Sequence, residues 1–372
     1  MFYLSLFALT STIFFLAQSC EARSRTLFWT LAYVGVFVLA FVAGCRDDAV
    51  GTDVHVYAKP TFDTARWASD FWQGYERREG WVELVYYAIN WAAASVSSRF
   101  GLALFLQNFI MTAFVMHGMA HYRRSAPLWM TMLAYELLFY NLTFNLMRQG
   151  LAVAFVLWSM RYFSRNSKWP LLLCAVVCFF VHKSSGVAYS AIFGIRWVAS
   201  MPAEKQKRLT FAFALAAIVS VALFPILLQS ITGQIPILRQ YAGYAKMAAE
   251  EAGVLKRDLV FYAAILLMLW VVVHRRMAER RTAYVASLLI LVYLASLGLG
   301  VHSPFAPRIG YYWLLAAIPL LFSTVMRCDI SRRSKILVAT AILLYLCEDC
   351  VKKNFVWGLN ETYPYASEFL GI

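Results

Sequence analysis

Basic side chains interrupt apolar sequence at four places in this chain. Arg46 follows an apolar run, Arg148 lies in FNLMRQG, His182 and Lys183 lie in CFFVHKSSG, and Arg308 follows two prolines in HSPFAPRIGYYW. A charge within apolar sequence is costly and usually serves a substrate, an ion or a partner. Arginine offers phosphate bidentate donors, and lysine offers a point charge. These cations therefore predict a site for an anion, and the obvious lipid-borne anion is a phosphate or pyrophosphate.

The segment RDDAVGTDVHVY (46–57) adds groups of the opposite kind. Gly51 permits a tight turn. Thr52 and Asp53 offer contacts to a sugar or a phosphate, and either Asp53 or His55 offers a proton acceptor. This segment is therefore predicted to contribute to the same site.

Structural roles compete with these functional ones. A lone arginine at the end of a span is often an anchor whose head reaches the interface, which is the alternative for Arg46. Salt-bridge packing is the alternative for His182 and Lys183. The polar neighbours of Arg148 favour a site there. Glu136 lies in mid-span and is predicted to be the buried partner of one of the cations.

The composition of the 372 residues indicates a membrane protein. Hydrophobic residues make up 61% and charged residues only 15%, whereas soluble domains carry about a quarter charged residues. Runs such as 211–228 and 259–273 contain no charge, and about 20 apolar residues cross the hydrocarbon core as a helix. These runs lack the alternation of apolar and polar residues that strands of a membrane barrel show. The prediction is an all-α polytopic transmembrane helical bundle, with 1–372 as a single integral membrane domain.

About a dozen spans are predicted, and the three between residues 149 and 199 are short for a full crossing. They lie near 2–19, 27–45, 101–119, 127–147, 149–163, 170–182, 186–199, 209–228, 259–274, 283–301, 309–326 and 336–350.

The distribution of basic residues predicts the topology. No basic residue precedes the first apolar stretch, whereas Arg23 and Arg25 follow it, which favours a first span with its N-terminus outside over a signal peptide. With this orientation every short basic loop falls on the cytoplasmic side. These basic loops account for the net charge of +14, so the charge does not indicate binding of nucleic acid. Two long segments, 46–100 and 229–258, and the anion site fall on the outer side.

The apolar stretch Trp81 to Ser98 would reverse this topology if it crossed the membrane. It is therefore predicted to be a re-entrant or interfacial helix on the outer face, where its aromatic residues suit the headgroup zone. The 46–100 segment is accordingly expected to be an outer loop with interfacial helices.

No motif for a metal or a nucleotide cofactor is present. The seven cysteines have no metal-ligand spacing, and Cys347 and Cys350 lie on an apolar helix outside any redox-domain context. The glycine-rich phosphate loops are absent. No metal and no cofactor are predicted.

Six blocks of sequence, in this order, resemble the EpsG-like family of Wzy-type polysaccharide (O-antigen and exopolysaccharide) polymerases. They are RDDAVGTDVHVY (46–57), EGWVELVYYAIN (79–90), FNLMRQGLAVAF (144–155), FVHKSSGVAYS (180–190), PRIGYY (307–312) and YPY (363–365). Such proteins are similar to the GT-C membrane glycosyltransferases, which use polyprenyl-linked sugars.

The resemblance implies an inverting glycosyltransferase of the bacterial inner membrane whose active site faces the periplasm. Donor and acceptor would be undecaprenyl-pyrophosphate-linked oligosaccharides, and membrane lipid and a chain-length regulator protein would be further partners. The implied catalytic residues are Arg148, Arg308, His182 and Asp53. The implied substrate-binding residues are Arg46, Lys183, Gln149, Gly51, Thr52, Tyr57, Glu83, Asn145, Ser184 and Tyr311.

Roles follow from the chemistry that the resemblance implies. Arg148 and Arg308, helped by Lys183 and Arg46, would stabilise the negative charge that grows on the leaving pyrophosphate. Either His182 or Asp53 would be the base for the acceptor hydroxyl. A carboxylate near the oxocarbenium-like sugar would help, and Glu83 or Asp53 can supply it.

Three other functions remain open from sequence. A flippase or exporter of lipid-linked glycans would spread its charges across the membrane depth and often show repeated halves. A membrane acyltransferase would use a deep histidine base. A ligase would differ from a polymerase only in its acceptor.

Overall fold

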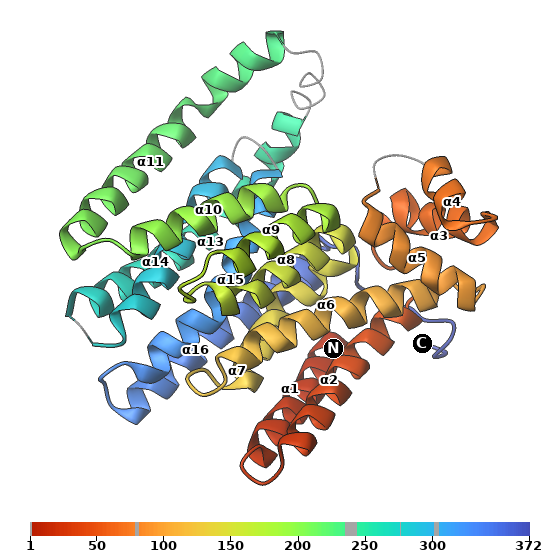
Figure 1. Ribbon diagram of the computed structural model, residues 1–372, viewed down its shortest axis with the longest axis horizontal. Coiled ribbons are helices and arrows are strands. Elements are labelled where there is room, and N and C mark those ends of the chain that lie inside the picture. Colours follow the sequence, from red (N-terminus) through yellow and green to blue (C-terminus); the bar gives the residue numbers. More distant parts are fainter. Residues whose placement is uncertain (1, 79–81, 235–243, 276, 301–304) are drawn as a thin grey trace. The chain divides into compact units, whose positions relative to one another are not determined.

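The computed structural model describes residues 2–78, 82–234, 244–275, 277–300 and 305–372; the side chains of 221–234, 244–255 and 305 are not included. Every regular element in these ranges is a helix, which confirms the all-α prediction. The chain forms two compact units, one of residues 1–185 and 332–372 and the other of 186–331. In the described residues both units are built from helices (Figure 1).

The first unit carries long helices, short helices and a C-terminal pair. These are α1 (Phe2–Cys20), α2 (Arg25–Cys45), η1 (Val54–Ala58), α3 (Lys59–Trp67), α4 (Phe71–Arg77), α5 (Leu84–Val96), α6 (Gly101–His121), α7 (Leu128–Tyr135), η2 (Glu136–Tyr140), η3 (Leu142–Phe144), α8 (Met147–Ser159), η4 (Met160–Tyr162), α9 (Trp169–Val181), α16 (Arg332–Cys350) and η6 (Val351–Val356). Helix α2 packs on α1 and α6, α6 packs on α8, and α8 packs on α9.

The second unit consists of five helices in the described ranges. These are α10 (Ser185–Ala199), α11 (Ala203–Gln234), α13 (Tyr244–Arg275), α14 (Arg280–Gly300) and α15 (Phe305–Arg327). Helix α14 packs against α11, α13 and α15. The segment 229–258, predicted as an outer loop, is helical up to Gln234 and again from Tyr244, with 235–243 outside the described residues.

Six helices in the described residues are long and apolar enough to cross a membrane, which fits a membrane protein. They are Phe2–Cys20, Arg25–Cys45, Gly101–His121, Lys256–Arg275, Arg280–Gly300 and Ala306–Arg327. The predicted count of about twelve is not confirmed. Helices α8 and α9 have 13 residues each and α10 has 15. At ~1.5 Å per residue these fall short of a ~30 Å crossing.

The span predicted near 127–147 is not one regular α-helix, and its crossing of the membrane stays a prediction. Helix α7 widens into the π-helical turn η2, passes through the 3-10 turn η3, and α8 begins only at Met147. Side chains from elsewhere in the chain hydrogen-bond the residues of this break. A non-helical backbone is tolerated at membrane depth when protein surrounds it in this way.

Glu136 is not the partner of a cation among the described residues, contrary to the prediction. Its carboxyl group is fully buried and accepts hydrogen bonds from the hydroxyls of Thr10 (2.8 Å) and Ser11 (3.2 Å). The reason is that α1 packs against α7 and brings two hydroxyl donors to this carboxyl group. Glu136 therefore holds two helices together.

The 46–100 segment folds into the short helices η1, α3, α4 and α5. They pack around a buried cluster of Val54, Ala58, Ala65, Val82, Tyr86 and Tyr87, together with Leu104 of α6 and Met147 of α8. Helix α5 has 13 residues, too few to cross a membrane, which agrees with the predicted non-spanning role. The cluster fixes these short helices against the start of α8.

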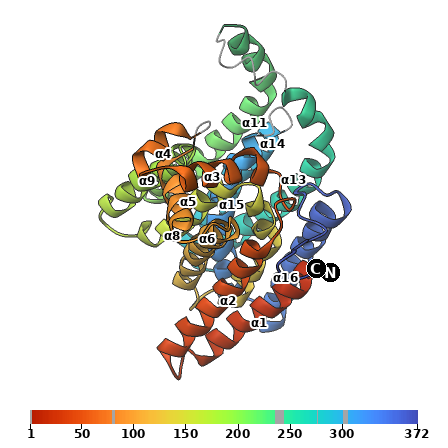
Figure 2. The same cartoon turned by 90° about the vertical axis from the view of Figure 1, so that its right-hand side faces the viewer.

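The C-terminal segment (residues 357–372) returns to the first two helices. Tyr365 donates a hydrogen bond to the carbonyl of Val42 (2.9 Å), and Ser367 donates one to the carbonyl of Cys45 (2.6 Å). The rings of Phe2 and Tyr365 stack with their centroids 4.3 Å apart. The two ends of the chain thus lie close together (Figure 2).

Candidate active site

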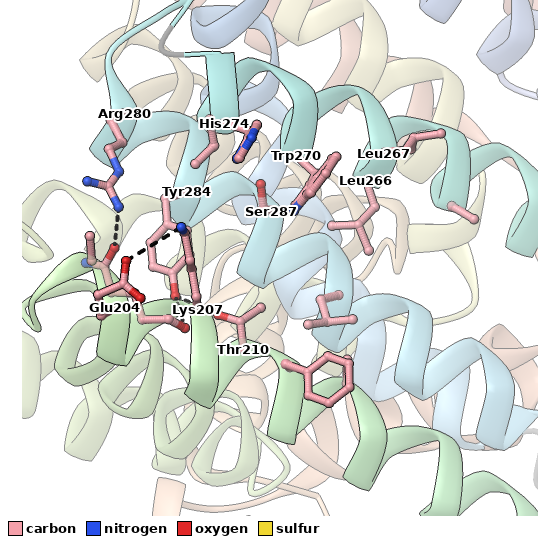
Figure 3. Close-up of a pocket in the computed structure, with 17 residues that line it drawn as sticks. Glu204, Lys207, Thr210, Leu266, Leu267, Trp270, His274, Arg280, Tyr284 and Ser287 are labelled. Atoms are coloured by element: carbon pink, nitrogen blue, oxygen red, sulfur yellow. Dashed lines mark hydrogen bonds and ion pairs between the residues drawn. The ribbon is translucent and has the colours of Figure 1, made fainter.

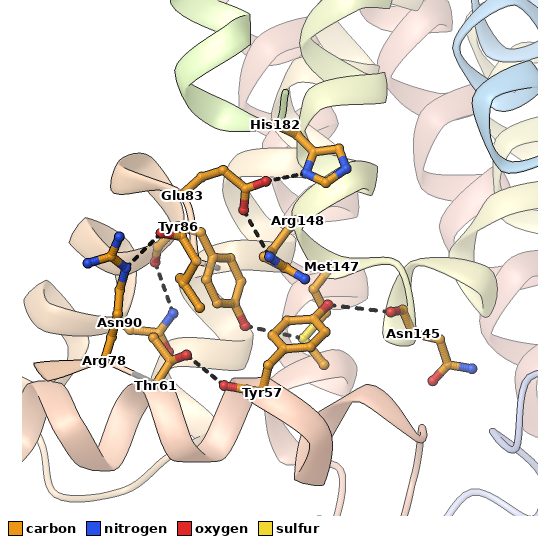
Figure 4. A network of polar contacts seen from close by, with 11 residues as sticks. Tyr57, Thr61, Arg78, Glu83, Tyr86, Asn90, Asn145, Met147, Arg148 and His182 are labelled. Atoms are coloured by element: carbon orange, nitrogen blue, oxygen red, sulfur yellow. Dashed lines mark hydrogen bonds and ion pairs between the residues drawn. The ribbon is translucent and has the colours of Figure 1, made fainter. Parts of the chain in front are cut away.

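Glu83 joins two of the predicted cationic groups in the first unit. One carboxylate oxygen lies 3.1 Å from Nη1 of Arg148, and the other lies 2.6 Å from Nδ1 of His182 (Figure 4). The Glu83 side chain is 10% exposed, whereas those of Arg148 and His182 are 23% and 22% exposed. Three distant segments therefore meet at one partly open point, which we call the Glu83 cluster (Glu83, Arg148 and His182).

Each member sits at the end of a helix. Glu83 is the N-cap residue of α5, Arg148 lies in the first turn of α8, and His182 is the C-cap residue of α9. Helix α8 packs on α9, and α5 also contacts α9. Packing of three helices thus brings three end residues together.

Arg148 occupies an electrostatically unfavourable position. A cation in the first turn of a helix opposes the positive end of the helix dipole. Glu83 offsets this charge, and the ring of Tyr57 lies 4.3 Å beneath the guanidinium carbon. The Tyr57 hydroxyl in turn donates to the carbonyl of Asn145 (3.4 Å). Several groups thus hold a costly cation in one place.

His182 presents a defined tautomer to the site. Because ionised Glu83 only accepts hydrogen bonds, Nδ1 of His182 is the donor in their contact. In the neutral imidazole, Nε2 is then the acceptor. Lys183 and Ser184 form the turn that follows, with Lys183 exposed. A histidine oriented by a carboxylate is the usual arrangement of a general base.

The surroundings of Glu83 decide its charge. Burial alone would raise its pKa, but the hydrogen bond and charge of His182 and the charge of Arg148 outweigh burial and hold the pKa of Glu83 below its usual range. The cluster therefore contains an ionised carboxylate at neutral pH.

This lowered pKa predicts how stability depends on pH. A carboxylate with a lowered native pKa contributes stability above its unfolded pKa, and the contribution is lost as the pH falls through the native value. The difference in thermal unfolding temperature between the wild type and Glu83→Gln should therefore be largest near neutral pH and shrink below about pH 4. A difference that stays constant as the pH falls into this range would contradict an ionised Glu83.

The loop after α2 places Arg46 and Gly51 beside the helix break. The Arg46 guanidinium is buried, donates to the carbonyl of Ala43 (3.2 Å), and lies 4.0 Å from the ring centre of Phe144. Gly51 has φ +97°, and a Cβ there would lie 2.9 Å from Oδ1 of Asn145. Glycine is thus required by both conformation and space.

The C-terminal segment holds this loop and the helix break together. The amide of Gly51 donates to the carbonyl of Glu361 (3.0 Å), and Nδ2 of Asn145 donates to the carbonyl of Asn360 (2.6 Å). Nδ2 of Asn141 donates to Oγ1 of Thr362 (2.9 Å). Residues 360–362 thus fasten together two of the blocks that carry predicted site residues.

Thr362→Val should destabilise the protein because it removes a buried acceptor while keeping the side-chain shape. The amide of Asn141 would lose its partner, at a cost of about 1–3 kcal/mol. The measurement is the free energy of unfolding in detergent. Thr12→Val is the control, because the exposed Thr12 hydroxyl bonds only its own helix in the contacts described. Equal losses of unfolding free energy in the two variants would show that the contact between Thr362 and Asn141 does not stabilise the protein.

The structure connects some predicted residues to the Glu83 cluster and not others. Asp53 and Tyr57 interact through a side-chain hydrogen bond and charge. Thr52 is exposed and Gln149 is buried. Arg308 and Tyr311 lie on α15 of the second unit, so their part in the site stays a prediction.

The sequence interpretation did not identify two contributors to the candidate site. Tyr86 lies within electrostatic reach of Arg46, Asp53 and Arg148, and its hydroxyl meets Met147 Sδ at 3.7 Å. The other contributor is the 360–362 segment, for which only the adjacent Tyr-Pro-Tyr block gave a signal. A tyrosine within an apolar stretch reads as an interfacial residue, so its contacts could not be inferred.

Comparison with known proteins gives one match. A family model described as the EpsG family matches residues 28–367, most of the chain. No curated protein matches the chain. No solved structure matches it either, so the expected likeness to the GT-C fold stays a prediction.

Proposed function

This chain belongs to the EpsG family of Wzy-like polymerases, and from that premise we propose that it polymerises polysaccharide repeat units. The donor would be an oligosaccharide on undecaprenyl pyrophosphate, and the acceptor would be a hydroxyl group of a second lipid-linked unit. The reaction would take place at the outer face of the bacterial cytoplasmic membrane. Family membership and the six apolar helices support the membrane setting.

One observation carries the assignment of roles. Glu83 contacts Arg148, which is suited to binding a phosphate, and His182, which is suited to accepting a proton. These residues lie 65 and 99 positions away from Glu83 in the chain. A flippase or exporter of lipid-linked glycans needs no such pairing of an anion-binding group with an oriented base. Glycosyl transfer from a pyrophosphate needs both.

Arg148 would stabilise the leaving group. During transfer the bond between C1 of the sugar and the pyrophosphate oxygen breaks, and negative charge grows on that oxygen. A guanidinium has five N–H donors, and Glu83 engages Arg148 through Nη1. A positioned cation in a poorly hydrated site favours this charge by several kcal/mol in comparable enzymes. Lys183 in the adjoining turn would add a second positive charge.

His182 would accept the proton. As the acceptor oxygen attacks C1 from the opposite face, its proton passes to Nε2 of His182, and the configuration at C1 inverts. Glu83 orients the ring through Nδ1 and favours the imidazolium that forms. Because Glu83 is already engaged by Arg148 and His182, Asp53 is the better carboxylate to face the oxocarbenium-like sugar.

A reconstituted assay tests the proposal. Purified protein in vesicles is given a defined undecaprenyl-pyrophosphate oligosaccharide, and the products are separated by size. A polymerase yields a ladder of longer lipid-linked glycans and releases undecaprenyl pyrophosphate. A flippase moves the substrate across the bilayer without a ladder, and this result would overturn the proposed function.

A further inference from the structure

The second unit contains a cavity that the proposed reaction does not use. Its volume is about 680 Å³, and it lies between α11 and α13 with α14 as its floor (Figure 3). This volume falls within the range of small-molecule sites. Both α11 and α13 pack on α14, so the cavity is a groove bounded by three helices.

One end of the groove is polar and basic. Lys207, His274 and Arg280 line it together with Glu204. Lys207 lies 3.7 Å from Glu204, but both side chains are more than 60% exposed, and an exposed pair of this kind is weak. Nη2 of Arg280 donates to Gln206 at 3.4 Å. The two cations are therefore held by weak contacts that an anion can replace.

Hydrogen bonds fix the floor of this end. The hydroxyls of Tyr284 and Thr210 lie 2.6 Å apart, and the Tyr284 hydroxyl also donates to the carbonyl of Gln206 (3.2 Å). These contacts join α11 to α14 immediately below Lys207 and Arg280 (Figure 3). The basic end of the groove is thus held in a fixed shape by these hydrogen bonds.

The rest of the groove is apolar. Phe211, Leu266, Leu267 and Trp270 line it. The Trp270 ring stacks on His274 with centroids 5.3 Å apart, where the apolar and basic parts meet. A tryptophan at such a boundary is typical of the membrane–water interface. The groove therefore has the polarity of a lipid, with a charged end and an apolar length.

The charge around the basic end matches an anion. The stretch 203–208 has three basic residues and one acid, and 274–281 has four arginines and one acid. Basic pockets between membrane helices on the cytoplasmic side bind anionic headgroups. The distribution of basic residues predicts that both stretches face the cytoplasm.

We infer that this groove binds one anionic glycerophospholipid, with its phosphate between Lys207 and Arg280 and an acyl chain along Phe211, Leu267 and Trp270. Charge complementarity carries the choice of occupant, because a zwitterionic headgroup would bring its own cation to the basic end. The inference concerns the second unit alone and does not depend on the proposed reaction.

The experiment measures lipid binding to purified protein by native mass spectrometry. Phosphatidylglycerol is compared with phosphatidylcholine of the same chains, and sn-glycerol 3-phosphate tests the headgroup without chains. The double variant Lys207→Gln/Arg280→Gln should lower the affinity for phosphatidylglycerol about tenfold or more. Lys205→Gln/Arg281→Gln is the matched control, because it removes the same charge from the same stretches but from residues that do not line the groove.

The inference requires that phosphatidylglycerol bind more tightly than both other probes and that only the groove variant lose affinity. Equal losses in the two double variants would assign binding to general surface charge and overturn it. Equal affinity for phosphatidylcholine or for glycerol phosphate would overturn it as well. If the groove variant does not fold, a photoreactive phosphatidylglycerol must label peptides of 203–214 and 263–274 in the wild type, and labelling elsewhere would overturn the inference.

Discussion

Arg148→Ala should reduce elongation of the lipid-linked glycan by about 10²–10³-fold, the usual loss when a donor to a developing anion is removed. Two contacts, with Glu83 and with the ring of Tyr57, hold the guanidinium in place. The measurement is the rate of ladder formation in vesicles, at saturating and at limiting donor concentration.

Arg148→Lys separates charge from geometry. Lysine keeps the charge but presents no planar pair of donors, so most of the loss should persist. The matched control is Arg66→Ala, because Arg66 also stacks on an aromatic ring, Trp67 at 5.0 Å, but lies outside the Glu83 cluster. Arg66→Ala should leave the rate within about twofold of the wild type.

Full elongation by folded Arg148→Ala would remove Arg148 from the mechanism. Folding is verified by the thermal unfolding temperature, because the change also leaves Glu83 without one of its partners. Loss of elongation in proportion to loss of folded protein would assign Arg148 a structural role only.

His182→Ala should lower the rate by about 10²–10⁴-fold, the range for loss of a general base. The expected sign of the pH effect follows from its role, because a base is active only when unprotonated. The wild-type rate should therefore rise with pH through an acidic limb, and this limb should be absent in His182→Ala. A packing role alone would not move the pH profile.

Glu83→Gln tests the orientation of the ring. Glutamine keeps the size of the side chain but can no longer neutralise the imidazolium that forms. The rate should fall, because the imidazolium that forms loses a carboxylate that favours it. Since Glu83 is a positioning residue, added imidazole should partly restore His182→Ala but not Glu83→Gln.

Two further variants test the choice of base. His121→Ala is the control, because His121 is an exposed histidine at the end of α6, outside the Glu83 cluster, and should leave the profile unchanged. If Asp53→Asn abolishes the acidic limb and His182→Ala does not, then Asp53 is the base and the assignment of His182 is wrong.

The amino-acid sequence by itself determined the class of the protein. Long uncharged runs require helices in a lipid setting, and the structure confirms that the described elements are helical. The residues that interrupt those runs, Arg148 and His182 among them, were identifiable because a charge in apolar sequence has a cost that composition alone reveals. Short helices between 149 and 199 were also evident from the length of the apolar stretches.

Tertiary structure alone decided which of these residues meet. Glu83 was predicted as a carboxylate for the sugar, but packing of α5 and α8 against α9 makes it the bridge between Arg148 and His182. Glu136 was predicted to pair with a cation, but α1 supplies it with two hydroxyls. Hydropathy and periodicity report on neighbours within a few turns of helix, whereas these contacts join residues about 65 to 126 positions apart and depend on how whole helices pack.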